Sequence, residues 1–308
     1  MIRVVASVGG KITTPHLDEL NLFRSTTWID VDKPTLHELN LLRDTLGLPL
    51  TELRHALDTK ERPRVKITSE YTLIIFGAHV TDTEHHSLPL ALFLTKRYLL
   101  TIHGHTMGVL EGIDIHSDIF KKIMQRGLPF LLYTILFRTI KEYFDPVDMI
   151  EDTVEEVEND VIHHHTKKST QRISTIKTKL VYMRKALIGN QKVIISFTKE
   201  HMGKDTHIFD DLNVEISQLI EEVDVYIERL NTSLNIYLTA LSNRINEIMK
   251  SFTVIASLML FPMFITGLYG MNVFLPLQHH PLAFFIISFL IVLMVVVILS
   301  IYKLKKWI

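Results

Sequence analysis

The residues best placed to do chemistry are Tyr269-Gly270-Met271-Asn272, a short polar break between two long uncharged stretches. Neither the stretch from Ser251 to Leu268 nor that from Pro281 to Tyr302 contains a charged residue. Each approaches the roughly 20 apolar residues that cross a ~30 Å hydrocarbon core. A polar tetrapeptide between two membrane spans lies at a membrane surface, where the carboxamide of Asn272 could select what enters a pore.

The remaining composition limits the class of protein. The chain has 308 residues, 47% of them hydrophobic, and a formal net charge of −1. Nearly all charged residues precede residue 251, so this part is predicted to be soluble and residues 251–308 to lie in the membrane. The balanced charge gives no reason to expect nucleic acid as a partner, because that would require a basic patch. The absence of cysteine excludes a disulfide framework and a thiolate metal site.

The charges beside the two spans predict their orientation. Lys250 precedes the first span and Lys303, Lys305 and Lys306 follow the second, whereas loop 273–280 has no Lys or Arg. Cationic residues stay on the cytoplasmic side, so both termini are expected in the cytoplasm and the loop outside. The first residues resemble a strand rather than a signal peptide. The expected location is the plasma membrane, with more than one pass.

Three parts are expected along the chain. Residues 1–205 are predicted to form a cytoplasmic α/β domain with a following helical hairpin, and residues 206–250 a cytoplasmic stalk helix. Residues 251–308 are predicted to form a transmembrane domain, with spans at about 251–269 and 281–302 and an outer loop over 270–280.

Periodicity predicts the elements of the soluble part. Short alternating or apolar runs predict strands, and leucines at helical spacing after Pro34 predict a helix that ends at Gly47. Beyond Ile113 the pattern is helical throughout. An acidic helix and a basic helix are expected to lie antiparallel with opposite charges facing, and a third helix to run from about residue 211 to 268. The expected strands are 2–8, 27–31, 72–76, 90–94 and 98–103, and the paired helices are 128–161 and 170–199.

Two spans alone cannot enclose an aqueous path, so an ion-conducting chain of this kind must form a symmetric ring. A helix as long as 211–268 also needs partners, either copies of itself or the α/β domain. The second span is apolar all round, as expected of a helix that faces lipid. The first carries polar residues that either line a pore or bond their own helix carbonyls. These residues are Ser242, Asn246, Thr253, Ser257 and Thr266.

The tetrapeptide at 269–272, ending the first of two carboxy-terminal spans, resembles the signature of the CorA family of magnesium transporters. The resemblance extends in order over essentially the whole chain. The matching segments are Trp28-Ile29-Asp30-Val31 with Pro34, Glu38 and Leu48-Pro49-Leu50, then Arg62-Pro63-Arg64-Val65 with Tyr71, then Phe93-Leu94 with Leu99 to His103, and finally Asn235 to Leu238, Ser242-Asn243 and Asn246 to Lys250.

This resemblance implies a homopentameric, funnel-shaped channel in the lipid bilayer that conducts divalent cations, chiefly Mg²⁺. Gly270, Met271 and Asn272 would form the selectivity filter, with five carboxamides facing a hydrated ion. It also implies that cytoplasmic Mg²⁺, bound between subunits at Asp211, regulates the channel. The residues expected to line the pore or form its gate are Asn235, Ser242, Asn246, Met249 and Phe252.

Two departures from the family pattern keep other ions open. Asn235 stands where relatives carry an acidic residue, and loop 273–281 lacks the acidic segment often found there. The alternatives are a CorA-like transporter of Co²⁺, Ni²⁺ or Zn²⁺, perhaps coupled to protons, and a membrane scaffold or sensor without ion flux. An enzyme is not expected, because no nucleophile–base pair or catalytic metal spacing stands out.

Each candidate residue also has a simpler interpretation. Asn272 could merely cap a helix, and Asp211 could be a solvated charge at a helix start beside Asp210. His163-His164-His165 is more typical of a solvated turn than of a zinc site. His279-His280 is either an interfacial loop or a pair of rings that repel cations when protonated in acid. Asp30 and Asp32 suggest a turn at a strand end, and Trp307 an interfacial anchor.

Overall fold

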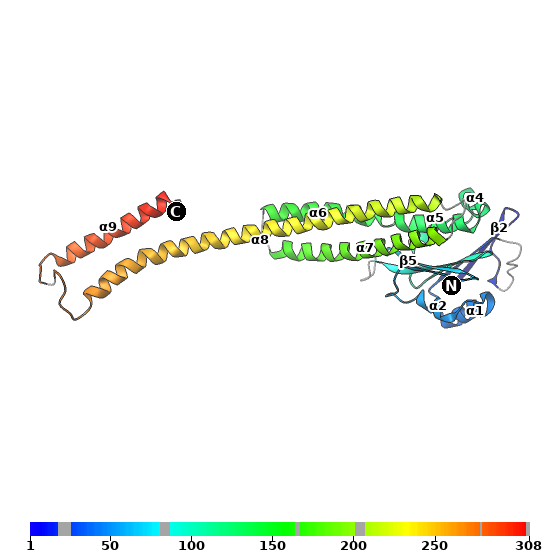
Figure 1. Cartoon of the computed structure of the whole chain (residues 1–308), viewed down its shortest axis with the longest axis horizontal. Helices are drawn as coiled ribbons and strands as arrows, with labels where there is room; N and C mark the ends of the chain where they lie inside the picture. Colours follow the sequence, from blue (N-terminus) through cyan, green and yellow to red (C-terminus); the bar gives the residue numbers. More distant parts are fainter. Residues whose placement is uncertain (18–25, 81–86, 164–166, 201–206, 278, 306–308) are drawn as a thin grey trace. The chain divides into compact units, whose positions relative to one another are not determined.

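The computed structural model describes residues 1–17, 26–80, 87–163, 167–200, 207–277 and 279–305 (Figure 1). Internal contacts divide the chain into two units, Met1–Ser233 and Leu234–Ile308. The division falls inside one long helix, α8 (His207–Tyr269).

The first unit contains a seven-stranded sheet with the order β2-β1-β3-β7-β6-β5-β4. The pairing of β3 with β7 is parallel and the other pairings are antiparallel. All five expected strands are found, and the two short strands β2 and β4 are additional. The strands are β1 (Ile2–Val8), β2 (Lys11–Thr13), β3 (Thr26–Asp32), β4 (Arg64–Ile67), β5 (Thr72–Ala78), β6 (Leu88–Leu94) and β7 (Tyr98–His103).

Helices cover both faces of the sheet, which explains why β5 and β7 are buried along their whole length. Helices α1 (Leu36–Leu46) and α2 (Leu50–His55) lie on one face (Figure 1). Helix α1 begins at a capping box between Thr35 and Glu38 and ends at Gly47, whose φ of 72° suits glycine. The other face carries α5 (Leu128–Lys141) and α7 (Lys167–Glu200), after the short helices α3 (Gly108–Glu111) and α4 (Asp118–Arg126).

The acidic helix expected over 128–161 is in fact two helices, α5 and α6 (Phe144–His163). Pro146 explains the break between them. It has no N–H to donate to the carbonyl four residues earlier, that of Glu142, and its ring would clash with that carbonyl in a continuous helix. The backbone turns at Glu142 and Tyr143 and resumes as α6, in whose first turn a proline is tolerated.

Helices α6 and α7 form the expected pair with opposite charges facing. Arg172 on α7 reaches Glu156 at 2.8 Å and Asp160 at 3.3 Å, both on α6. The first part of α8 joins this pair through Arg229, which lies 2.7 Å from Glu158, and through Asp224, which pairs with Arg184. The link between α6 and α7, with His164 and His165, lies outside the described residues.

Asp30 does more than end a strand. The residue is 7% exposed, and its carboxylate accepts hydrogen bonds from Thr101 (2.7 Å), His103 (3.2 Å) and Arg3 (3.0 Å). Burial disfavours both charges, but their hydrogen bond and mutual attraction prevail, so the pKa of Asp30 is lowered and that of His103 raised. A charged pair is therefore built into the centre of the sheet.

The second unit consists of the rest of α8 and α9 (Ala283–Leu304). At 1.5 Å per residue, the 63 residues of α8 span about 95 Å. Both helices contain stretches long and apolar enough to cross a membrane. Most of their large apolar side chains are exposed in the single chain, and none of α9 is buried. A membrane and neighbouring chains would cover these surfaces.

Candidate ion pathway

The polar tetrapeptide lies where α8 ends. The N–H of Gly270 donates to the carbonyls of Thr266 (2.9 Å) and Gly267 (3.2 Å), and that of Met271 to Leu268 (3.2 Å). Neither Gly270 nor Asn272 has a positive φ. The left-handed helix cap that would explain these residue types locally is therefore not formed here.

The side chain of Asn272 is exposed, and its carboxamide makes no hydrogen bond to any part of the chain that the structure describes. Gly270 is not required by packing either, because an added Cβ would meet only the carbonyls of Thr266 and Gly267, at 3.4 and 3.5 Å. The chain's own structure thus leaves the choice of glycine and asparagine at these positions unexplained.

Hydrogen bonds hold the loop after the tetrapeptide. The hydroxyl of Tyr269 donates to the carbonyl of Pro276 at 3.1 Å, and Leu277 adopts a φ of 67°. The backbone N–H of Leu282 donates to Nδ1 of His280 at 3.2 Å, just before α9. The ring of His280 thus accepts a hydrogen bond just before a helix start, and both His279 and His280 are exposed.

Most of the predicted pore residues share one face of α8. At 3.6 residues per turn, Asn235, Ser242, Asn246 and Met249 fall within about 40° of one line along the helix. All four are exposed in the single chain. Phe252 lies about 100° away from that line by the same geometry, and Thr253 takes its place on the line. Counting alternate steps of four and three residues from Thr253 finds the continuation of this face at Ser257, Leu260, Phe264 and Gly267.

The hydroxyls in the membrane part of α8 bond their own helix. Thr253 donates to the carbonyl of Met249 at 2.8 Å, and Thr266 to that of Pro262 at 3.0 Å. Ser257 donates to Val254 and also accepts from the hydroxyl of Tyr302 on α9 at 3.0 Å. Ser257, at the edge of the face that carries Asn235, thus also contacts the second helix, and its polar group serves the contact between the two spans.

Asp211 is exposed near the start of α8 and forms no ion pair with the residues that the structure describes. Its neighbour Glu215 is held by Lys141 at 2.7 Å. Burial raises the pKa of Tyr133, and the negative charges of Asp211 and Glu215 raise it further. Within the described part of one chain, no three His, Asp or Glu side chains gather as a metal site. The carboxylate of Asp211 offers the hard oxygen that Mg²⁺ prefers.

Comparisons with known proteins agree on one family. The family described as CorA-like Mg²⁺ transporter protein matches residues 24–306. The cobalt/magnesium transport protein CorA of Methanocaldococcus jannaschii is 31% identical over 320 residues, with 100% of both chains covered. That of Thermotoga maritima is 26% identical over 277 residues, covering 85% of this chain and 77% of the relative.

Comparison with solved structures points to the same family. The complete structure of the CorA magnesium transporter from Methanocaldococcus jannaschii superposes with a TM-score of 0.87 at 28% identity, covering 100% of this chain and 99% of that chain. The full-length CmaX protein, 16% identical, shares the fold with a TM-score of 0.75. By sequence and by fold, this membrane protein belongs to the CorA family of Mg²⁺ transporters.

Proposed function

We propose that this protein forms a homopentameric channel that conducts Mg²⁺ through a ring of Asn272 side chains. The observation that carries the proposal is the free, exposed carboxamide of Asn272 at the end of a membrane helix. No local cap or contact requires it, so its role lies outside the single chain. Symmetry would place one copy from each subunit around a common axis.

Amide oxygens suit a hydrated dication. Mg²⁺ sheds its water reluctantly, and a carboxamide oxygen can accept hydrogen bonds from the bound water without displacing it. A ring of such dipoles attracts the ion yet releases it, as conduction requires. A dication moving inward across 100 mV gains roughly 4.6 kcal/mol, so the flux needs no coupled energy source.

The exposed face of α8 supplies the pathway below the ring. Asn235, Ser242 and Asn246 are polar, and Met249 adds an apolar constriction to the same face. Phe252 lies beside this face and would tighten the constriction through contact with a neighbouring subunit. The apolar surface of α9 would face lipid, with both termini in the cytoplasm and residues 270–280 outside.

Asp211 would bind regulatory Mg²⁺ together with a carboxylate of the next subunit. Its carboxylate near the start of α8 pairs with none of the described residues, which supports this role, since the ion would join helices that continue into the membrane. Ions bound there in the closed state would favour that state, and a fall in cytoplasmic Mg²⁺ would release it.

Co²⁺ is the second proposed cargo, because the relatives from Methanocaldococcus jannaschii and Thermotoga maritima are named cobalt/magnesium transport proteins. The lack of a carboxylate at Asn235 and in loop 273–281 weakens electrostatic attraction equally for all divalent cations. Competition among Mg²⁺, Co²⁺, Ni²⁺ and Zn²⁺ for uptake would rank them.

The test is ion flux into vesicles that contain the purified protein, with an Mg²⁺-sensitive dye inside. Asn272→Ala should reduce the initial rate of Mg²⁺ entry at least roughly tenfold, the loss expected for one good polar contact to a charged species. The matched control is Val273→Ala, the next loop residue, which carries no polar group. Equal rates for Asn272→Ala and wild type would refute the ring, and no flux in wild type would favour a scaffold or sensor.

A further inference from the structure

The two membrane helices are joined by a pair of hydroxyls near the carboxyl end of α9. The hydroxyl of Tyr302 on α9 donates to Oγ of Ser257 on α8 at 3.0 Å. Ser257 in turn donates to the carbonyl of Val254 at 2.8 Å. Because the serine proton is used in this second bond, the tyrosine is the donor in the first. The three groups form a chain of hydrogen bonds from α9 to the backbone of α8.

This contact lies in an interface built mainly from apolar side chains. On α8, Val254 is 6% exposed, and Leu258 and Ile265 are partly buried on the same side of the helix. On α9, the partly buried face ends at Tyr302 and contains Ile291, Val295 and Ile298. Packing between apolar side chains is not directional, so it defines the rotation of one helix against the other less well than a hydrogen bond does.

The hydroxyl of Tyr302 is not needed to fill this interface. A phenylalanine would occupy the same space, and α9 already carries Phe284, Phe285 and Phe289. A tyrosine near a membrane surface commonly directs its hydroxyl to water, but this one is directed to Ser257. Since a hydroxyl at membrane depth needs a partner within the protein, the serine oxygen supplies what the tyrosine requires.

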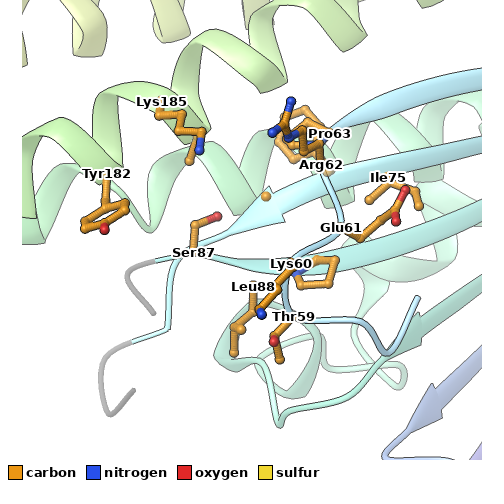
Figure 2. A pocket seen from close by; sticks show the side chains of 14 residues that line it. Thr59, Lys60, Glu61, Arg62, Pro63, Ile75, Ser87, Leu88, Tyr182 and Lys185 are labelled. Atoms are coloured by element: carbon orange, nitrogen blue, oxygen red, sulfur yellow. The ribbon is translucent and has the colours of Figure 1, made fainter. Parts of the chain in front are cut away.

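The first unit uses the same kind of contact to fix two elements against each other. The buried hydroxyl of Tyr143, between α5 and α6, lies 3.0 Å from the carbonyl of Gly77 on β5 and 3.2 Å from Oγ of Ser87. Ser87 precedes β6 and lines a cavity of about 530 Å³ (Figure 2). There the tyrosine holds the bend between two helices against the sheet.

The position of Ser257 along α8 connects the hydroxyl pair to the proposed ion pathway. At 1.5 Å per residue, Ser257 lies about 12 Å along the helix from Met249 and about 6 Å from Thr253. Loop 270–282 joins the two helices at their other ends, whereas here α8 continues towards the first unit and α9 ends. The pair therefore provides a directional contact between the helices beside the apolar constriction.

We propose that Tyr302 is a positioning residue for ion conduction that acts through Ser257. Resting on the proposed function, its hydrogen bond sets the rotation of α8 so that the face through Asn246 and Met249 points to the pore axis. Without the bond, α8 samples rotations that turn this face away, and a smaller fraction of channels conducts. Ion entry at Asn272 is unaffected, so the maximal rate falls while the Mg²⁺ concentration for half-maximal rate stays the same.

The experiment measures Mg²⁺ entry into vesicles over a range of external Mg²⁺ for wild type, Tyr302→Phe, Ser257→Ala and the double variant. Loss of a typical hydrogen bond between membrane helices changes an equilibrium roughly threefold, so each single variant should lower the maximal rate by at least that factor. The double variant should be no slower than either, because both changes remove the same bond. Ser257→Thr, which keeps a hydroxyl, should recover most of the rate lost in Ser257→Ala.

Ser300→Ala is the matched control, because the hydroxyl of Ser300 on α9 donates to the carbonyl of Val296 in its own helix at 2.8 Å. It should keep the wild-type rate. A wild-type rate in Tyr302→Phe, or losses that add in the double variant, would overturn the proposal. A loss accompanied by a raised half-maximal concentration would also overturn it, since that points to the ion-binding ring.

Failure of this proposal is distinguishable from failure of the Asn272 ring. If Tyr302→Phe conducts like wild type while Asn272→Ala does not, the ring stands and the positioning role is wrong. If wild type carries no Mg²⁺, the channel and the positioning role are both wrong. The melting temperatures of the four proteins then still measure the bond, and the single and double variants should show the same decrease.

Discussion

Asn190 takes the place of a missing strand, and its removal should destabilise the first unit sharply. Strand β4 pairs with β5 only from Thr72 to Ile75, so Gly77 lies beyond its end. There the carboxamide of Asn190 accepts from the N–H of Gly77 at 2.7 Å and donates to its carbonyl at 2.8 Å. The side chain thus continues the hydrogen bonding of the sheet edge.

The magnitude follows from the groups left unpaired. Asn190 is 0% exposed, so Asn190→Ala leaves the Gly77 N–H without its buried protein partner, a loss of about 1–3 kcal/mol. The carbonyl keeps the hydroxyl of Tyr143 at 3.0 Å and loses only one of two donors, about 1 kcal/mol more. A total near 3 kcal/mol should lower the melting temperature of a unit of this size by roughly 6–12 °C.

The assay is thermal unfolding of the full-length protein in detergent, followed by circular dichroism. Gln191→Ala is the matched control, since Gln191 is the next amide on α7 and makes one partly buried bond to Ser217 at 2.9 Å. Tyr143→Phe removes the other donor to Gly77 and should cost about 1 kcal/mol. If the melting temperature of Asn190→Ala equals those of Gln191→Ala and Tyr143→Phe, the carboxamide does not substitute for a strand.

Three further predictions address the sheet centre and the ion pathway. The Asp30–His103 pair should add most stability above the ordinary pKa of aspartate, 3.8, and below that of histidine, 6.5. This contribution is lost as pH rises through the raised pKa of His103 or falls through the lowered pKa of Asp30. Urea unfolding measures it as the difference in unfolding free energy between wild type and His103→Asn, which should shrink towards pH 9. A difference that is constant from pH 5.5 to 9 would contradict the charged pair. Gly270→Ala should leave the melting temperature within about 1 °C, because its Cβ meets only ordinary contacts at 3.4 Å or more, yet it should slow Mg²⁺ flux by crowding the ring. Unchanged flux would show that glycine is not needed there. Asn235→Asp should increase flux at low Mg²⁺ and low salt, with the gain fading at high salt, and a salt-independent gain would exclude an electrostatic cause.

Local patterns were sufficient for the strands and for the existence of the helices. The apolar runs at β5, β6 and β7 are unambiguous because each strand is buried on both faces. The helical period continues across Pro146, so periodicity alone predicts one helix where the structure has α5 and α6. The proline is the local signal of the break, because it cannot continue the hydrogen bonding of the helix.

Local sequence patterns do not predict pairings across long sequence distances. Asn190 meets Gly77 from 113 residues away, and His103 meets Asp30 from 73. Each of these side chains is polar in a local pattern that also suits an exposed position, so only the assembled sheet reveals its partner.

Asn272 is the opposite case. The tetrapeptide is evident in the sequence, but no contact within one folded chain explains it. Its carboxamide has no partner among the described residues, and its backbone needs no special residue. An exposed amide costs nothing in a monomer, but in the proposed ring it would be one of several dipoles aimed at the same ion. The face of α8 through Asn235, Ser242 and Asn246 is likewise unexplained within one chain. The proposed symmetric oligomer would account for both features, so its disruption should abolish flux even where the first unit stays folded.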